Sequence, residues 1–207
     1  MAIYKNSNFL IILISPSGGG KSSIANRVLE ISENIDYSVS YTTRPPRWNE
    51  IDGRDYNFVS ETEFAQLLKQ DQLLEHAQVH GYNYGTSRKY IKNILSQEHH
   101  AILDIDVQGA LQIIEKDIDA VTIFILPPTV KILEDRLNKR KTDSKEVIEI
   151  RLKNARNELD YLDLDKFHYL VINDNFDDAV QEVKLIISAE EKKISRIKNI
   201  KNTFYGG

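Results

Sequence analysis

The clearest chemical signal in the chain is a glycine-rich run near its start, Ser15-Pro-Ser-Gly-Gly-Gly-Lys21-Ser22, which follows six apolar residues (9–14). Main-chain N–H groups in such a turn can surround an anion, and a helix that begins there adds the positive end of its dipole. The lysine of this pattern reaches the β- and γ-phosphates of a nucleotide, and the hydroxyl after it binds Mg²⁺. The run therefore predicts a strand, a phosphate-binding loop and a helix, with Lys21 and Ser22 as ligand-binding residues.

The same run has a simpler interpretation, a tight turn between a strand and a helix that binds nothing. The flanking elements favour phosphate binding, because a buried strand precedes the loop and the apolar residues after it share one helical face. Ser15 stands where the phosphate-binding pattern normally begins with glycine. Its Cβ would crowd the turn if φ there were positive, so the local geometry is left open.

A second group of side chains that could bind phosphate lies between residues 42 and 58. Arg44 and Arg47 are three residues apart, and the hydroxyl of Tyr56 follows them. Guanidinium groups match phosphate oxygens in a bidentate manner, so two of them with a phenol could clamp a monophosphate. The alternative is an exposed loop with scattered salt bridges, which is the better interpretation for an isolated pair of arginines.

Two carboxylates, Asp104 and Asp106, end another apolar run (101–106), and on a strand they would share one face. Strands alternate with helices along most of the chain, which predicts an α/β fold with a mostly parallel sheet flanked by helices. Ligands of such sheets bind at the carboxyl ends of the strands. The two aspartates are therefore expected to face the phosphate-binding loop, although aspartates at strand ends also cap helices.

The apolar periodicity predicts the elements that position these groups. Strands are expected at 9–14, 37–42, 56–59, 101–106, 121–126 and 169–172. Helices are expected at 21–32, 87–97, 108–115, 130–139 and 176–188, with two more after a Ser60–Glu63 capping box and around residues 148–159. Residues 41–86 interrupt the alternation as a small mixed α/β unit. The last segment is expected to be a solvated basic tail that contains Lys192, Lys193, Arg196, Lys198 and Lys201.

Composition excludes several classes of function. The 207 residues are enough for one domain with small appendages, and 41% hydrophobic with 28% charged residues is typical of a globular protein. A net charge of −4 gives no argument for nucleic acid or a membrane surface as a partner. There is no cysteine, and the five histidines lack metal-ligand spacing. Since no apolar run is long enough to span a bilayer and residues 1–6 lack a signal-peptide core, a cytoplasmic location is expected.

Taken together, these stretches resemble the guanylate kinase family over essentially the whole chain. The resemblance is carried by the glycine-rich loop, by Ser40 and the Thr42–Arg47 run, and by Gly53-Arg-Asp-Tyr56-Asn-Phe58. It continues through Tyr84-Gly-Thr86, Asp104-Ile-Asp106-Val-Gln-Gly109 and Ile172-Asn-Asp174. It implies a P-loop core (1–40, 87–128 and 157–207), a GMP-binding subdomain (41–86) and a helical lid (129–156). The implied activity is transfer of the γ-phosphoryl group of ATP to GMP, and also to dGMP, with Mg²⁺ as cofactor.

The resemblance also implies roles for individual residues. The ligands of the GMP phosphate would be Arg44, Arg47, Tyr56 and Tyr84, and the guanine-reading groups Ser40, Glu75, Thr86 and Asp106. ATP would be bound by Ser15, Pro16, Ser17, Gly18, Gly19, Gly20, Lys21, Ser22, Ser23 and Asn173, and the metal by Ser22 and, through water, Asp104. The catalytic residues would be Lys21, Arg44 and the lid arginines Arg136, Arg140 and Arg151.

Elementary chemistry agrees with these roles. An ionised carboxylate only accepts hydrogen bonds, so Glu75 suits the adjacent N1–H and N2–H₂ donors of guanine and disfavours adenine. Arg136 and Arg140 are four apart on a helix and would project together, either over a γ-phosphate or into solvent. No general base is needed, because the acceptor is already a phosphate oxyanion.

Two other functions of the same fold are kept as alternatives. The first is a guanylate-kinase-like module that binds protein partners, against which Lys21 and the three intact glycines argue. The second is a kinase that acts on another phosphorylated acceptor, against which Ser40, Glu75 and Thr86 argue. The expected partners are the small-molecule nucleotides GMP and ATP, with no nucleic acid and no membrane, and the protein is expected to be a monomer or a homodimer.

Overall fold

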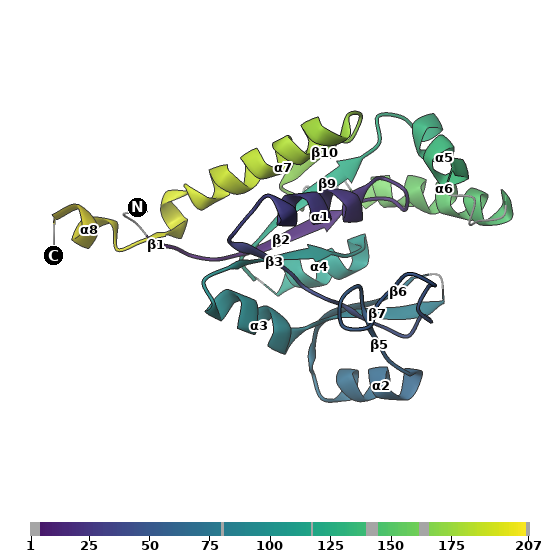
Figure 1. The fold of residues 1–207 in the computed structure, drawn as a ribbon, viewed down its shortest axis with the longest axis horizontal. Helices are drawn as coiled ribbons and strands as arrows, with labels where there is room; N and C mark the ends of the chain where they lie inside the picture. The colour runs from purple at the N-terminus through teal and green to yellow at the C-terminus, as the bar shows by residue number, and fades with distance from the viewer. Residues whose placement is uncertain (1–4, 80, 117, 140–144, 162–165, 206–207) are drawn as a thin grey trace.

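A computed structural model describes residues 5–79, 81–116, 118–139, 145–161 and 166–205 (Figure 1). Its larger sheet has five parallel strands in the order β10-β9-β2-β8-β3. The central strand β2 (Leu10–Ile14) pairs with β8 (His100–Asp104) on one side and with β9 (Ala120–Leu126) on the other. The outer strands are β3 (Ile35–Tyr37) and β10 (Tyr169–Ile172). The predicted parallel sheet is therefore confirmed.

Helices cover both faces of this sheet, because every residue of β2 is apolar and buried. On one face, Ile11 and Leu13 pack in a core with α1 (Lys21–Glu30) and α7 (Phe176–Glu191). On the other face, Leu10 and Ile12 pack in a core with α3 (Arg88–Ser96) and α4 (Val107–Glu115). The two layers lie above and below the sheet in Figure 1. Burial on both sides fixes β2 and hence the loop that follows it.

A smaller mixed sheet of four strands, in the order β5-β4-β7-β6, lies beside the larger one (Figure 1). Its strands are β4 (Tyr41–Thr42), β5 (Asn57–Phe58), β6 (Leu73–Val79) and β7 (Tyr82–Ser87). Helix α2 (Glu61–Lys69) covers it through buried Phe64 and begins at the predicted capping box, in which Glu63 N–H donates to Ser60 Oγ at 3.2 Å. The mixed unit expected within residues 41–86 is present.

Two details of the predicted strands were wrong. The single strand expected at 37–42 is split, because β3 ends at Tyr37 in the larger sheet and β4 begins at Tyr41 in the smaller one. Alternation continues across the break, so periodicity alone does not reveal that the chain changes sheets. The strand expected at 101–106 ends at Asp104, and Asp106 is the N-cap of α4, where its carboxylate accepts a 2.8 Å hydrogen bond from Gly109 N–H. The two aspartates therefore do not share a strand face.

Two further helices pack against each other at one end of the molecule. These are α5 (Val130–Lys139) and α6 (Lys145–Leu159), which share a small core of Leu133, Leu137, Ile148 and Ala155. They cover most of the segment in which a lid was expected, and they lie next to the loop after β2 (Figure 1).

The C-terminal segment lies at the opposite end of the molecule and differs from the solvated tail that was expected (Figure 1). Strand β11 (Ile197–Lys198) pairs with β1 (Lys5–Asn6), and helix α8 (Ile200–Tyr205) follows. Arg196 is 8% exposed, lies 3.3 Å from Glu190, contacts Asp119 and stacks over Phe9 at 4.1 Å from the ring centre. Burial with two carboxylate partners explains why the prediction failed at this residue.

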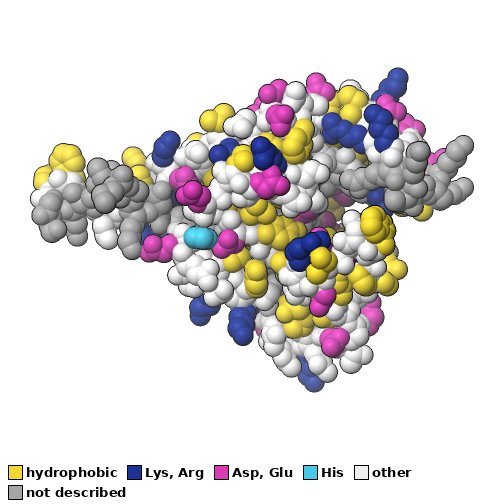
Figure 2. Space-filling model, in the orientation of Figure 1, with side chains coloured by type: hydrophobic (Ala, Val, Ile, Leu, Met, Phe, Trp, Pro, Cys, Tyr) yellow, Lys and Arg dark blue, Asp and Glu magenta, His cyan; other side chains and the backbone are white. Residues whose placement is uncertain are grey.

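Among the described helices, none has the length and apolar character needed to cross a bilayer. Figure 2 shows acidic and basic side chains interspersed over the visible face, as the small net charge suggests.

Candidate active site

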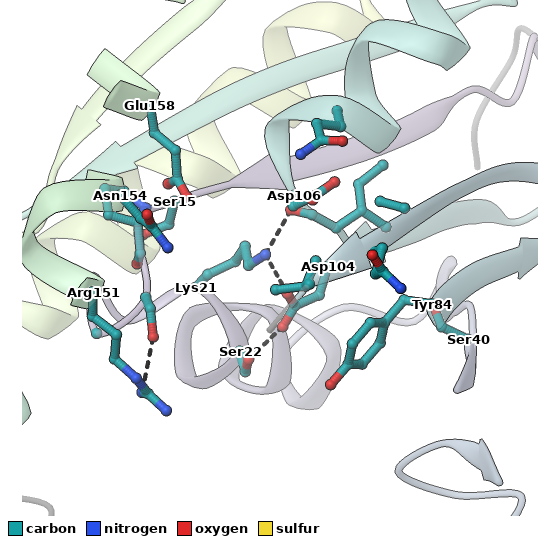
Figure 3. Close-up of a pocket in the computed structure, with 18 of the residues that line it drawn as sticks. Ser15, Lys21, Ser22, Ser40, Tyr84, Asp104, Asp106, Arg151, Asn154 and Glu158 are labelled. Atoms are coloured by element: carbon teal, nitrogen blue, oxygen red, sulfur yellow. Dashed lines mark hydrogen bonds and ion pairs between the residues drawn. The ribbon is translucent and has the colours of Figure 1, made fainter. Parts of the chain in front are cut away.

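A cavity of about 520 Å³ lies where the larger sheet, the smaller sheet and α6 meet. It is lined by the loop after β2, by the carboxyl end of β8, by β6 and β7, and by one face of α6 (Figure 3). Most of the residues that the sequence singled out line this one cavity, although they are spread over more than a hundred positions in the chain.

The loop after β2 has the backbone geometry that its glycines suggest. Gly18 and Gly20 have φ of 95° and 100°, which side chains other than glycine adopt only with strain. A Cβ at Gly20 would lie 2.3 Å from Asn173 Nδ2, so the close approach also requires glycine. Ser15 is absent from the described residues with positive φ, and its Oγ donates to Pro16 O at 3.1 Å. The question that the sequence left open is thus answered for the backbone, because φ at Ser15 is not positive and its Cβ causes no strain of that kind.

Lys21 and Ser22 begin α1 and meet the end of β8 (Figure 3). Lys21 Nζ lies 2.7 Å from Asp104 Oδ1 and donates to Ile105 O at 2.6 Å. Ser22 Oγ donates to the other oxygen of Asp104. The parallel pairing of β2 with β8 causes this convergence, since Leu13 lies opposite Asp104. A cation, a hydroxyl and a carboxylate therefore lie together at the start of a helix.

Glu75 is the most deeply buried carboxylate of the cavity, with 3% exposure, and comes from β6. Thr86 on β7 donates to its Oε1 at 2.5 Å, and a Cβ at Gly109 would lie 2.4 Å from its Oε2. Burial raises the pKa of Glu75 to about 7, and the charge of Asp106 adds to this, whereas the hydrogen bond from Thr86 opposes it. Ser40, Glu75 and Asp106 line one part of the cavity, so the expected guanine-reading residues are brought together.

The expected phosphate clamp is formed by the loop between β4 and β5 together with Tyr84 on β7. Arg44 Nε donates to Tyr84 Oη at 3.2 Å, and the guanidinium of Arg44 lies 5.4 Å from the centre of the Tyr56 ring. The rings of Tyr56 and Tyr84 meet edge to face at 5.9 Å. Burial raises the pKa of Tyr56. Arg47, Tyr56 and Tyr84 line the cavity, so the two arginines and two phenols form one group.

The three arginines that were expected to belong to a lid have different surroundings. Arg151 on α6 donates to Ser17 Oγ of the glycine-rich loop at 3.0 Å (Figure 3). Arg136 on α5 donates to Asn173 O at 2.8 Å, and Asn173 Nδ2 in turn donates to Gly19 O at 2.8 Å. Arg140 lies outside the described residues, so its expected projection beside Arg136 stays a prediction.

Several residues that line the cavity were not predicted from the sequence: Asn154, Asn157 and Glu158 of α6, and Tyr161 just after it. Glu158 Oε2 is buried and has no hydrogen-bond partner among the described residues. Burial raises the pKa of Glu158 to about 7, and Lys21 opposes this. The sequence does contain a pattern that indicates these residues, because Arg151, Asn154 and Glu158 follow the i, i+3, i+7 spacing of one helical face. Asn154 and Glu158 are therefore expected on the same face as Arg151.

A parallel α/β sheet with a glycine-rich loop, a lysine and a hydroxyl at the end of its central strand defines a P-loop nucleotide-binding protein. Comparison with known proteins is more specific, because the guanylate kinase family model matches residues 7–190. The guanylate kinase of Rickettsia bellii (strain RML369-C) is 44% identical over 189 residues, which are 91% of this chain and 98% of that protein. The guanylate kinase of Clostridium perfringens (strain SM101 / Type A) is 43% identical over 197 residues, covering 95% and 90%.

A solved structure agrees. The crystal structure of guanylate kinase from Anaplasma phagocytophilum superposes with a TM-score of 0.80 at 30% identity, over 99% of this chain and 97% of that one. The chain therefore belongs to the guanylate kinase family. The resemblance and the fold class predicted from the sequence are both confirmed.

Proposed function

We propose that this chain transfers the γ-phosphoryl group of ATP to GMP and gives ADP and GDP, as an ATP:GMP phosphotransferase of purine nucleotide metabolism. The observation that carries the proposal is that two groups suited to phosphate line a single cavity. The glycine-rich loop with Lys21 forms one group, and Arg47, Tyr56 and Tyr84 belong to the other. A phosphoryl group can pass directly between nucleotides only if their phosphates meet in one space.

The donor nucleotide is assigned to the loop at residues 15–23. Its main-chain N–H groups and the start of α1 suit the β- and γ-phosphates, and Lys21 adds a positive charge. Arg151 and Asn173 contact this loop, which supports their assignment to the donor side. Arg136 would act there through Asn173, whose carbonyl it binds.

Mg²⁺ fits the oxygen donors of this part of the cavity. Ser22 and Asp104 are the residues that would hold it, with Asp104 acting through water, and their oxygens contact each other. The described residues contain no cluster of three or more His, Cys, Asp or Glu able to hold a metal. Mg²⁺ is commonly held by one or two protein oxygens together with substrate phosphates and water, which matches the pair formed by Ser22 and Asp104. When bound, the ion neutralises charge on the β- and γ-phosphates.

The acceptor is assigned to the smaller sheet. Arg44, Arg47, Tyr56 and Tyr84 would bind its phosphate, since Arg47, Tyr56 and Tyr84 line the cavity and Arg44 contacts both phenols. The guanine base is assigned to Ser40, Glu75, Thr86 and Asp106. Ionised Glu75 accepts from N1–H and N2–H₂ of guanine, whereas adenine would present an acceptor to it. The acceptor attacks through a phosphate oxyanion, so positioning and charge stabilisation account for catalysis without a general base.

The proposal includes a division of the chain into the P-loop core, the GMP-binding subdomain at 41–86 and the lid at 129–156. Closure of the two smaller parts over the cavity would exclude water that could otherwise hydrolyse ATP. A cytoplasmic location, a monomeric or homodimeric state, and the use of dGMP stay predictions.

A coupled assay of ADP release tests the function, with MgATP and each of GMP, dGMP, AMP, UMP and CMP as acceptor. We expect turnover with GMP that exceeds turnover with AMP, UMP and CMP by at least about tenfold in kcat/KM, because one paired base contact discriminates by about 1–3 kcal/mol. Preference for another monophosphate would mean a kinase for a different acceptor. Absence of turnover with all five would favour a module that binds protein partners.

A further inference from the structure

A carboxylate lies inside the group of arginines assigned to the acceptor phosphate. Glu50 accepts two hydrogen bonds from Arg44, with Nη2 at 2.8 Å from Oε1 and 3.0 Å from Oε2. The same carboxylate accepts from Arg47 N–H at 2.8 Å and lies 3.7 Å from Arg47 Nη1. A negative side chain among groups meant to bind a dianion is unexpected, because it repels that ligand.

The contacts of Glu50 fix the orientation of Arg44. Arg44 Nη1 donates to Pro45 O at 2.8 Å and Nε to Tyr84 Oη at 3.2 Å, so all three nitrogens of the guanidinium have a partner. The side chains of Arg44 and Glu50 are each only 12% exposed. Among these contacts, only the one with Glu50 is charged on both sides, and Nη2 donates to both carboxylate oxygens, which makes it the strongest of the three.

We propose that Glu50 is a positioning residue, which orients the guanidinium of Arg44 and fixes the main chain at Arg47 in the geometry that binds the acceptor phosphate. The proposal rests on the proposed function. Two guanidinium groups that converge on one point repel each other, and the shared carboxylate offsets this repulsion before the ligand arrives. An arginine that is already oriented loses less conformational freedom when phosphate binds, so affinity rises through preorganisation.

A competing idea is that the Glu50 carboxylate occupies the place of the phosphate and must leave when GMP binds. The backbone of Glu50 argues against this, because Glu50 N–H donates to Arg47 O at 3.0 Å while its carboxylate accepts from Arg47 N–H. Although partial burial raises the pKa of Glu50, the hydrogen bonds from Arg44 and from Arg47 N–H outweigh it and hold this pKa below its ordinary value. The carboxylate is thus charged and built into the turn.

Trp48 provides a direct measurement of binding at this turn. It is the only tryptophan of the chain, it follows Arg47, and it is 98% exposed. Its fluorescence can be titrated with GMP and with guanosine in the absence of ATP, so that binding is measured apart from catalysis. Guanosine offers the base without the phosphate and reports on the rest of the acceptor site.

We expect Glu50→Gln to raise the Kd of GMP at least tenfold and to change the Kd of guanosine less than twofold. In assays with MgATP, KM for GMP should rise in the same proportion while KM for ATP stays within twofold. Glu50→Asp keeps the charge on a shorter side chain and should give an intermediate Kd for GMP. The matched control is Asp55→Asn, which removes a negative charge from the same loop. The carboxylate of Asp55 pairs with Arg54 at 2.8 Å and not with Arg44 or Arg47. It should leave the Kd of GMP within threefold.

Several outcomes would overturn the proposal. Tighter GMP binding by Glu50→Gln would mean that the carboxylate competes with phosphate, and an unchanged Kd would mean that it does not orient Arg44. Equal losses for GMP and guanosine, or an equal loss in Asp55→Asn, would mean that it only maintains the loop. The wild-type protein separates this test from the proposed function, since wild-type protein that neither binds nor phosphorylates GMP would refute that function first.

Discussion

The two ends of the cavity are suited to phosphate by different means. The donor end is built on main chain, in the loop between β2 and α1, to which Lys21 and Ser22 add side chains, and both elements belong to the buried core. The acceptor end is made of side chains on the smaller sheet, where β4 and β5 have only two residues each. Donor geometry is therefore set by the fold, whereas acceptor geometry depends on contacts among Arg44, Glu50 and Tyr84.

This difference separates general from specific recognition. Main-chain N–H groups are the same in every protein and suit the phosphates that all nucleoside triphosphates share. Side chains differ in charge, shape and donor pattern, so the choice of acceptor lies in the smaller sheet. We therefore expect changes at the donor end to reduce the reaction itself, and changes at the acceptor end to alter which substrate binds and how tightly.

The largest effect is expected from Lys21→Ala at the donor end. Lys21 should stabilise charge that develops on the transferred phosphoryl group, so kcat should fall by about 10²–10³-fold, as when one charge-stabilising donor is removed from other active sites. The measurement is steady-state kinetics with saturating MgATP and GMP.

The same variant tests the separation of the two ends. Titration of Trp48 fluorescence should give a Kd for GMP within about twofold of wild type, because Lys21 pairs with Asp104 and not with the acceptor clamp. An unchanged kcat would remove Lys21 from the mechanism. A lost GMP affinity in a variant that still unfolds cooperatively would show that the two ends are not independent.

An effect of intermediate size is expected when pH changes the ionisation of Glu75 and thereby the affinity for GMP. Its pKa of about 7 means that the carboxyl is mostly protonated at pH 6 and mostly ionised at pH 8. Only the ionised form accepts from both donors of guanine, so the Kd of GMP should fall by about tenfold over this range. Because burial raises this pKa, the stabilisation of the unliganded fold by protonated Glu75 is lost as pH rises through about 7.

Glu75→Gln is the control for this titration. It should raise KM for GMP by about 10–100-fold with little change in KM for ATP, and its residual pH dependence should come from the phosphate of GMP, whose second pKa is about 6. Glu158 also has a pKa raised to about 7, so Glu158→Gln shows whether that residue contributes. Equal effects of Glu75→Gln on both substrates, or an unaltered pH profile, would contradict base reading by Glu75.

The comparison also explains how much the sequence could predict. The donor end could be derived from elementary physical chemistry, because a buried strand, glycines with a forced geometry and a helix start are all local features. The acceptor end could not, since Arg44 and Glu75 look like ordinary surface charges until a distant strand places them beside Tyr84 and Thr86. There the resemblance to a family supplied what the residues alone left open.

The errors have the same origin. The break between β3 and β4 lies within one alternating run, and which sheet a strand joins is decided by tertiary pairing. Arg196 has a basic neighbourhood in the sequence, but its partners Glu190 and Asp119 are brought to it only by the fold. Local pattern predicts elements well, and it predicts poorly what a long polar side chain meets.

The smallest effect is expected from Ser15→Gly, which restores the residue that normally begins the phosphate-binding pattern. Because φ at Ser15 is not positive, the serine causes no strain that glycine would relieve. Its hydroxyl donates to Pro16 O, which also accepts from Gly19 N–H at 2.9 Å, so removing the hydroxyl leaves no unpaired carbonyl. KM for ATP should therefore change less than about threefold. A lost hydrogen bond to a charged group would change it by more than that.

Ser15→Ala is the matched variant, because it removes the hydroxyl and keeps Cβ. Both variants should have the same KM for ATP. The Tm of Ser15→Gly should be about 1–4 °C lower than that of Ser15→Ala, because glycine adds about 0.5–1 kcal/mol of backbone entropy to the unfolded chain. A change of tenfold or more in KM for ATP in Ser15→Gly would mean that the side chain at this residue shapes the donor site. The geometry of the donor loop would then depend on a side chain, as the acceptor geometry does, and the contrast between the two ends would fail.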